Sequence, residues 1–91
     1  MGFQSVIRDR ARWMHHIQFL QRQERLEAAQ ELSDILKLED EARREGSQSP
    51  RLLEWIEQLQ PVLEVLEAWK RGDCNEKLFT VQWRKYRRQN V

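Results

Sequence analysis

The sequence predicts an all-α protein: a hairpin of long helices followed by a short C-terminal helix, in one domain that assembles as a dimeric helical bundle. Three observations predict this fold class. The 91 residues include only three Gly and two Pro, too few for the turns of a sandwich or barrel. Hydrophobic residues recur at intervals of three and four, as they do on one face of a helix. Helix-ending and helix-capping residues separate the periodic segments.

The first helix is expected over about residues 3–45, because neither Gly nor Pro occurs there. A polar run at residues 21–25 interrupts its apolar stripe. The residues of this run are good helix formers, so we expect the helix to continue through them. A hinge in the run is the alternative.

The turn is expected at residues 46–49, where Gly46 can end a helix and Ser49 can cap the next one. The second helix then covers about residues 50–71, with Pro50 at its first position. Pro61 removes one hydrogen bond, so we expect a kink near residue 61. Two shorter helices that meet at residues 60–61 are the alternative.

The third helix is expected over about residues 74–88. Gly72 ends the second helix, and Asp73 with Glu76 three residues later forms a capping-box pattern. The apolar residues that follow fit two structures. Phe79, Val81 and Trp83 alternate as in a strand, whereas Phe79, Trp83 and Tyr86 form a helical stripe. A lone strand has no partner in this chain, so the pattern favours helix.

The lengths of the first two helices predict a homodimer. At about 1.5 Å per residue they span roughly 60 Å and roughly 33 Å, so the second cannot cover the apolar stripe of the first. The excess must meet the third helix, fold back on itself or pair with a second chain, and a symmetric dimer is the commonest solution. The residues expected in the core or dimer interface are Ile17, Leu20, Leu32, Ile35, Leu36, Leu59, Leu63 and Leu66.

Polar residues interrupt the apolar stripe of the first helix at Arg10, Gln21, Glu24 and Glu39. In coiled coils such residues fix register and oligomeric state. Along one continuous helix they are too far apart to act together within one chain, so a buried catalytic pair is not expected.

Charge is segregated along the chain. Residues 1–25 and residues 72–91 each carry five basic and two acidic groups, a net charge of +3, whereas residues 26–45 carry three basic and seven acidic groups, a net charge of −4. A hairpin brings the two basic regions to one pole, which would attract phosphate backbones. A solvated helix surface is the alternative interpretation of these charges.

The predicted function is therefore binding of RNA or duplex nucleic acid by its backbone, without base-specific readout. The residues expected to contact phosphates are Arg8, Arg12, Arg22, Arg84, Arg87 and Arg88. The alternative is a protein–protein adaptor or regulator that docks a partner helix on an exposed helix face.

We expect neither enzymatic activity nor a cofactor or metal. His15 and His16 are adjacent and diverge on a helix, and Cys74 is the single cysteine, so no ligand set with the usual spacing exists. No stretch is apolar enough to span a membrane, and the N-terminus lacks a signal-peptide core. The expected location is cytoplasmic or nuclear.

Overall fold

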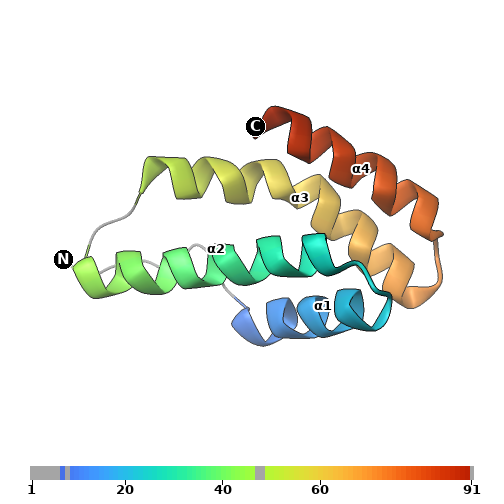
Figure 1. Ribbon diagram of the computed structural model, residues 1–91, viewed down its shortest axis with the longest axis horizontal. Coiled ribbons are helices and arrows are strands. Elements are labelled where there is room, and N and C mark those ends of the chain that lie inside the picture. The colour runs from blue at the N-terminus through green and yellow to red at the C-terminus, as the bar shows by residue number, and fades with distance from the viewer. Residues whose placement is uncertain (1–6, 8, 47–48, 91) are drawn as a thin grey trace. The chain divides into compact units, whose positions relative to one another are not determined.

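A computed structural model describes residue 7, residues 9–46 and residues 49–90 (Figure 1). These residues form four helices and contain no strand, which confirms the predicted all-α class. The helices are α1 (Arg10–Arg22), α2 (Leu26–Glu45), α3 (Pro50–Arg71) and α4 (Glu76–Gln89). The chain divides into two compact units, residues 1–53 and residues 54–91, and each is described by itself.

The first unit corrects the prediction of one continuous helix over residues 3–45. α1 ends at Arg22 and α2 begins at Leu26. The helix is therefore interrupted inside the polar run, as the hinge alternative expects. The reason is the backbone of Glu24, whose φ is 59°. This left-handed conformation cannot continue a right-handed helix.

Backbone hydrogen bonds close the end of α1. The amide of Arg25 donates to the carbonyl of Leu20 at 2.8 Å, and the amide of Glu24 donates to the carbonyl of Gln21 at 3.0 Å. These two bonds form a Schellman motif, in which a left-handed residue satisfies the last carbonyls of a helix. Glycine is the usual residue at that position, and here it is glutamate.

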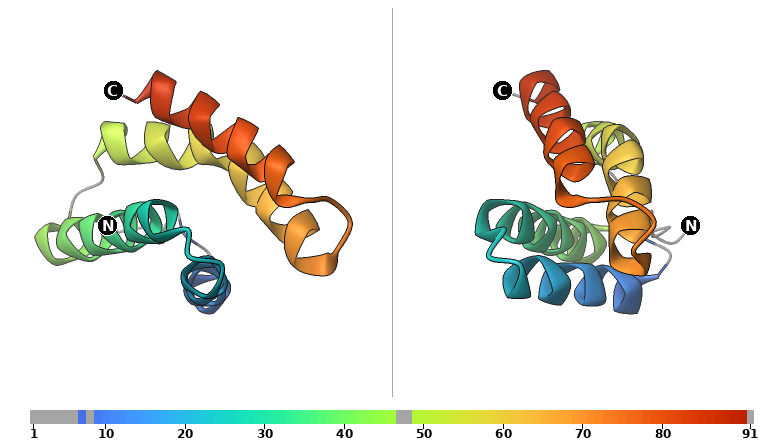
Figure 2. Two further views of the ribbon diagram at one scale, coloured as in Figure 1. Left: turned by 45° about the vertical axis from the view of Figure 1, so that its right-hand side comes forward. Right: turned by 90° about the vertical axis from the view of Figure 1, so that its right-hand side faces the viewer.

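The break lets α2 turn back along α1, and the two helices are in contact (Figures 1 and 2). The apolar stripe of the first segment therefore folds back on itself, which was one of the three outcomes of the length argument. The length mismatch no longer requires a second chain, and the homodimer stays a prediction. The eight residues predicted for the core or dimer interface are all buried in the single chain: Ile17, Leu20, Leu32, Ile35, Leu36, Leu59, Leu63 and Leu66.

The end of α2 and the start of α3 follow the sequence prediction. Gly46 has a φ of 73° and ends α2 in the left-handed conformation. The Ser49 hydroxyl accepts a hydrogen bond from the amide of Leu52 at 3.4 Å, which is the predicted cap. Residues 47 and 48 of the expected turn, like residues 3–6 of the expected first helix, lie outside the described residues.

α3 runs through Pro61 without interruption, so the alternative of two shorter helices is wrong. Figure 1 shows the helix changing direction in its middle. Proline explains a bend of this kind, because it lacks an amide hydrogen and its ring crowds the preceding turn.

The second unit pairs α3 with α4 across a turn at Gly72, whose φ is 83°. The amide of Asp73 donates to the carbonyl of Ala68 at 2.8 Å, so this turn also closes as a Schellman motif. α4 begins later than expected, because Asn75 caps it by accepting a hydrogen bond from the Leu78 amide at 3.3 Å. The predicted Asp73 cap is therefore wrong, since residue 73 completes the end of α3.

A row of aromatic rings joins α3 to α4. The ring centroids of Trp69 and Phe79 are 5.4 Å apart, those of Phe79 and Trp83 are 6.4 Å apart, and those of Trp83 and Tyr86 are 5.5 Å apart. The three aromatic residues of α4 are buried, as the helical interpretation of their spacing expects. Contacts at these distances stabilise a core beyond simple burial.

Candidate nucleic-acid interface

The exposed side of α4 is strongly basic. Between residues 77 and 88 the chain has five basic residues and no acidic one. All five are exposed: Lys77, Arg84, Lys85, Arg87 and Arg88. Because Phe79, Trp83 and Tyr86 hold the opposite side of the helix in the core, the cations are held on the outer side. We call these five residues the α4 basic face.

A contact with an aromatic ring orients one of these cations. The guanidinium carbon of Arg87 lies 6.0 Å from the centroid of the Trp83 ring, which is cation–π distance. Arg84 and Arg88 are four residues apart and therefore neighbours on the helix surface. Arg87 and Arg88 also lie in the last turn of α4, where cations interact favourably with the helix dipole.

The remaining predicted phosphate contacts belong to the first unit. Arg12 and Arg22 are both exposed on α1, but they are ten residues apart, or about 15 Å along the helix. Arg12 forms an ion pair of 3.9 Å with exposed Asp9. Arg8 lies outside the described residues. α4 thus brings Arg84, Arg87 and Arg88 together, and the meeting of both basic regions at one pole stays a prediction.

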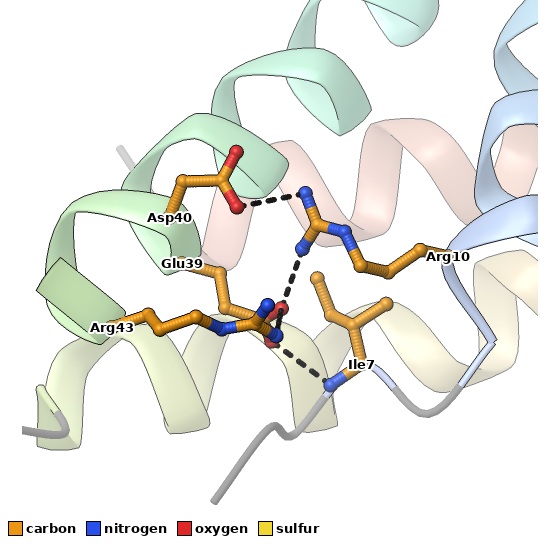
Figure 3. A network of polar contacts seen from close by, with 5 residues as sticks. All are labelled: Ile7, Arg10, Glu39, Asp40 and Arg43. Carbon is orange, nitrogen blue, oxygen red and sulfur yellow. Dashed lines mark hydrogen bonds and ion pairs between the residues drawn. The ribbon is translucent and has the colours of Figure 1, made fainter. Parts of the chain in front are cut away.

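A buried carboxylate in the first unit was not predicted as a meeting point of charges. Glu39 on α2 has a fully buried side chain. Its Oε1 lies 2.6 Å from Nη1 of Arg10, and its Oε2 accepts a hydrogen bond from the amide of Ile7 at 3.0 Å (Figure 3). Arg10 reaches Asp40 at 3.0 Å as well, and Arg43 lies 3.8 Å from Oε1.

This network corrects the expectation that Arg10 and Glu39 are too far apart to meet within one chain. That expectation assumed a continuous helix, and the turn at Glu24 removes the assumption. Both carboxylate oxygens of Glu39 already accept from protein donors, so the arrangement anchors Ile7 and Arg10 to α2. Each oxygen of the buried carboxylate has a donor within hydrogen-bond distance, as expected of a structural ion pair.

The two histidines and the single cysteine are the remaining candidate ligands or nucleophiles. His16 is buried and His15 is exposed, because adjacent residues diverge by about 100° on a helix. Cys74 is half-buried, and its Sγ donates to the carbonyl of Val65 at 3.5 Å. Within the described ranges, no group of three or more His, Cys, Asp or Glu side chains could hold a metal ion.

Comparisons with protein families, with characterised proteins and with solved structures gave no match to this chain. Among the helices described above, none combines the length and the apolar composition of a membrane span.

Proposed function

We propose that the protein binds nucleic acid through phosphate contacts made by the α4 basic face. The observation that carries the proposal is the run of five exposed cations without an acidic residue between residues 77 and 88. Cations grouped in this way displace the counterions of a phosphate backbone, and this release favours binding. Arginine adds a planar fork that matches two phosphate oxygens.

The burial of the α4 aromatic residues favours recognition of the backbone over recognition of bases. Single-strand binders stack bases on exposed aromatic rings beside their cations. On α4 the three aromatic rings are 1–7% exposed, so the basic face offers cations and aliphatic groups but no ring for stacking. We therefore propose a duplex, RNA or DNA, as the preferred ligand, with no dependence on base sequence.

Arg8, Arg12 and Arg22 extend the proposal to the first unit. Each would contribute a further phosphate contact if the two basic regions meet on one ligand. Their individual contributions are expected to be smaller than those of α4, because α1 carries its exposed arginines about three turns apart.

A titration against duplex RNA, duplex DNA and single strands at two salt concentrations tests the proposal. We expect the affinity to fall as salt rises, with a log–log slope of about 0.9 per phosphate contacted. Arg84→Gln with Arg88→Gln should weaken binding to all sequences alike and flatten the slope by about one per lost contact.

The matched control is Lys37→Gln with Arg44→Gln, which removes two exposed cations from α2 instead. It makes the same change in net charge and should leave the slope unchanged. Equal losses in both variants would show that net charge, and not the α4 basic face, governs binding. Absence of binding at about 50 mM salt to every nucleic acid would overturn the proposal, since Coulomb attraction is strong there.

An adaptor or regulator is the second candidate function, and one observation favours it. Leu78 and Val81 are 44% and 57% exposed on the outer side of α4, among the cations. Exposed aliphatic groups contribute little to phosphate binding but suit a protein partner. A chain that fails the titration would therefore be assigned to this class.

A further inference from the structure

α2 and α4 carry exposed rows of opposite charge with the same spacing. On α2 the row is Asp34, Leu38 and Glu41, and all three are exposed. Each row consists of a charged residue, an aliphatic residue four positions later and a second charged residue seven positions after the first. At 3.6 residues per turn these positions lie on one side of a helix.

On α4 the corresponding row is Lys77, Val81 and Arg84, and these side chains are exposed as well. Two cations here flank an apolar centre, where two carboxylates do so on α2. The separation of seven residues is about 10.5 Å along the axis in both helices. A parallel alignment therefore places each cation opposite a carboxylate and the two aliphatic residues opposite each other.

The surroundings of the two rows strengthen this complementarity. α2 contains seven acidic and three basic residues, and α4 contains five basic and one acidic residue. Glu27 and Glu45 continue the acidic row toward the two ends of α2, whereas Lys37 borders it on one side. Asp34 accepts a hydrogen bond from Gln30 at 2.8 Å, which leaves its second oxygen for a cation.

We propose that the row on α4 of one chain docks on the row on α2 of a second copy of the chain. In a two-fold symmetric dimer this contact occurs twice, because each copy presents both rows. The aliphatic pair supplies the dry centre of the contact, and the charges fix its register and partner.

The dimer and nucleic acid compete for the same cations. Carboxylates of α2 occupy the positions that phosphates would take on α4, so self-association regulates access to the α4 basic face. The self-association itself does not depend on the proposed function, and each can fail alone.

Sedimentation velocity of the full chain tests the inference. We expect a dimer at about 50 mM salt that dissociates at about 500 mM, where screening extends over only a few ångströms. A chain that stays monomeric at about 50 mM salt and about 100 µM protein overturns the inference, because a Kd weaker than that is not specific association. A dimer that persists at high salt also overturns it, since another surface would then hold the copies.

Charge reversal identifies the surfaces. Lys77→Glu with Arg84→Glu, and separately Asp34→Lys with Glu41→Lys, should each weaken the dimer about tenfold. A chain with all four substitutions should regain the affinity to within about threefold, because opposite charges face each other again. A four-substitution chain no better than either pair overturns the inference.

Glu54→Lys with Glu57→Lys is the matched control on α3, where both carboxylates are exposed. It changes the net charge as the α2 pair does and should leave the dimer constant unchanged; an equal loss overturns the inference. The α2 pair also separates the two proposals, because it keeps every cation of α4. A monomer that binds duplex contradicts only the self-association, and a salt-sensitive dimer that binds no nucleic acid contradicts only the proposed function.

Discussion

Two turns of the chain, the one between α1 and α2 and the one between α3 and α4, have the same hydrogen bonding but different residues at the left-handed position. At the first turn that residue is Glu24, with a φ of 59°, and at the second it is Gly72, with a φ of 83°. In both, the amide of the residue after the left-handed one donates at 2.8 Å to a carbonyl five positions earlier. The motif therefore forms with or without glycine, although glycine adopts it at lower cost.

The two helices on either side of each turn are joined by a different kind of contact. The first places Arg10 beside Glu39, so an ion pair with a buried carboxylate lies between α1 and α2. The second places Phe79 beside Trp69, so rings meet between α3 and α4. Charged groups require an exact partner when they are buried, whereas rings tolerate several arrangements. We infer that the first unit depends more strongly on the correct closure of its turn.

Among the substitutions that test this difference between the two units, removal of the Glu39 carboxylate should lower the free energy of unfolding the most. Glu39→Ala removes the carboxylate acceptor of the Ile7 amide and one of the two carboxylates that Arg10 contacts. The loss of a charge-assisted hydrogen bond together with an unsatisfied buried amide costs about 2–3 kcal/mol of the free energy of unfolding. Chemical denaturation followed by circular dichroism measures the loss, and amide hydrogen exchange assigns it to α1 and α2.

Glu39→Gln is the matched variant, because it keeps the volume and one acceptor oxygen but removes the charge. It should lose about half as much stability, since a neutral acceptor still satisfies part of the network. Exchange rates in α4 should stay unchanged in both variants. Equal acceleration in both units, or a loss below about 1 kcal/mol for the alanine variant, would show that the ion pair does not hold the first unit together.

The sequence predicts well those helices whose ends are marked by glycine, proline or capping residues. Gly46, Ser49 and Pro50 locate the end of α2 and the start of α3, and the stripe of Phe79, Trp83 and Tyr86 identifies α4 as a helix. The exposed arginines of α4 follow from that stripe, because a helix that buries one side exposes the other. These predictions rest on local signals within a few residues.

The break at Glu24 could not be predicted in the same way. Its neighbours are good helix formers, and the packing of α1 on α2 outweighs their local preference. Missing this break also made the prediction for Arg10 and Glu39 wrong, because these residues meet only when the chain reverses between them. The polar residues at both positions were a signal for this reversal. Polar residues within an apolar stripe can pair with each other in one chain, as well as fix the register between two chains.

Gly72→Ala should have an intermediate effect and tests the turn that the sequence predicts. A Cβ at residue 72 meets no atom within 4 Å, so the cost is conformational and not steric. We expect a loss of about 1 kcal/mol in the free energy of unfolding, because the left-handed conformation is unfavourable for a residue with a Cβ. Gly72→Asn is the control and should lose less, as asparagine tolerates this conformation. Equal losses would point to a cause other than the backbone angle.

Glu24→Gly should have the smallest effect and the opposite sign. Glycine relieves the left-handed strain of about 1 kcal/mol at residue 24, but it also increases the entropy of the unfolded chain. The net result should be a gain of about 0.5 kcal/mol in the free energy of unfolding, measured by chemical denaturation. Slower amide exchange confined to α1 and α2 would assign the gain to the first unit.

Glu24→Ala separates the backbone from the side chain at the same position. It removes the exposed carboxylate but keeps a Cβ in the left-handed conformation, so its stability should stay within about 0.3 kcal/mol of the original chain. If alanine stabilised the protein as much as glycine does, the carboxylate and not the backbone would be the unfavourable element at this turn. If glycine destabilised the protein, the result would favour a helical conformation at residue 24, because glycine weakens a helix interior by about 1 kcal/mol. The sign of this single substitution therefore decides between a turn and a helix at residue 24.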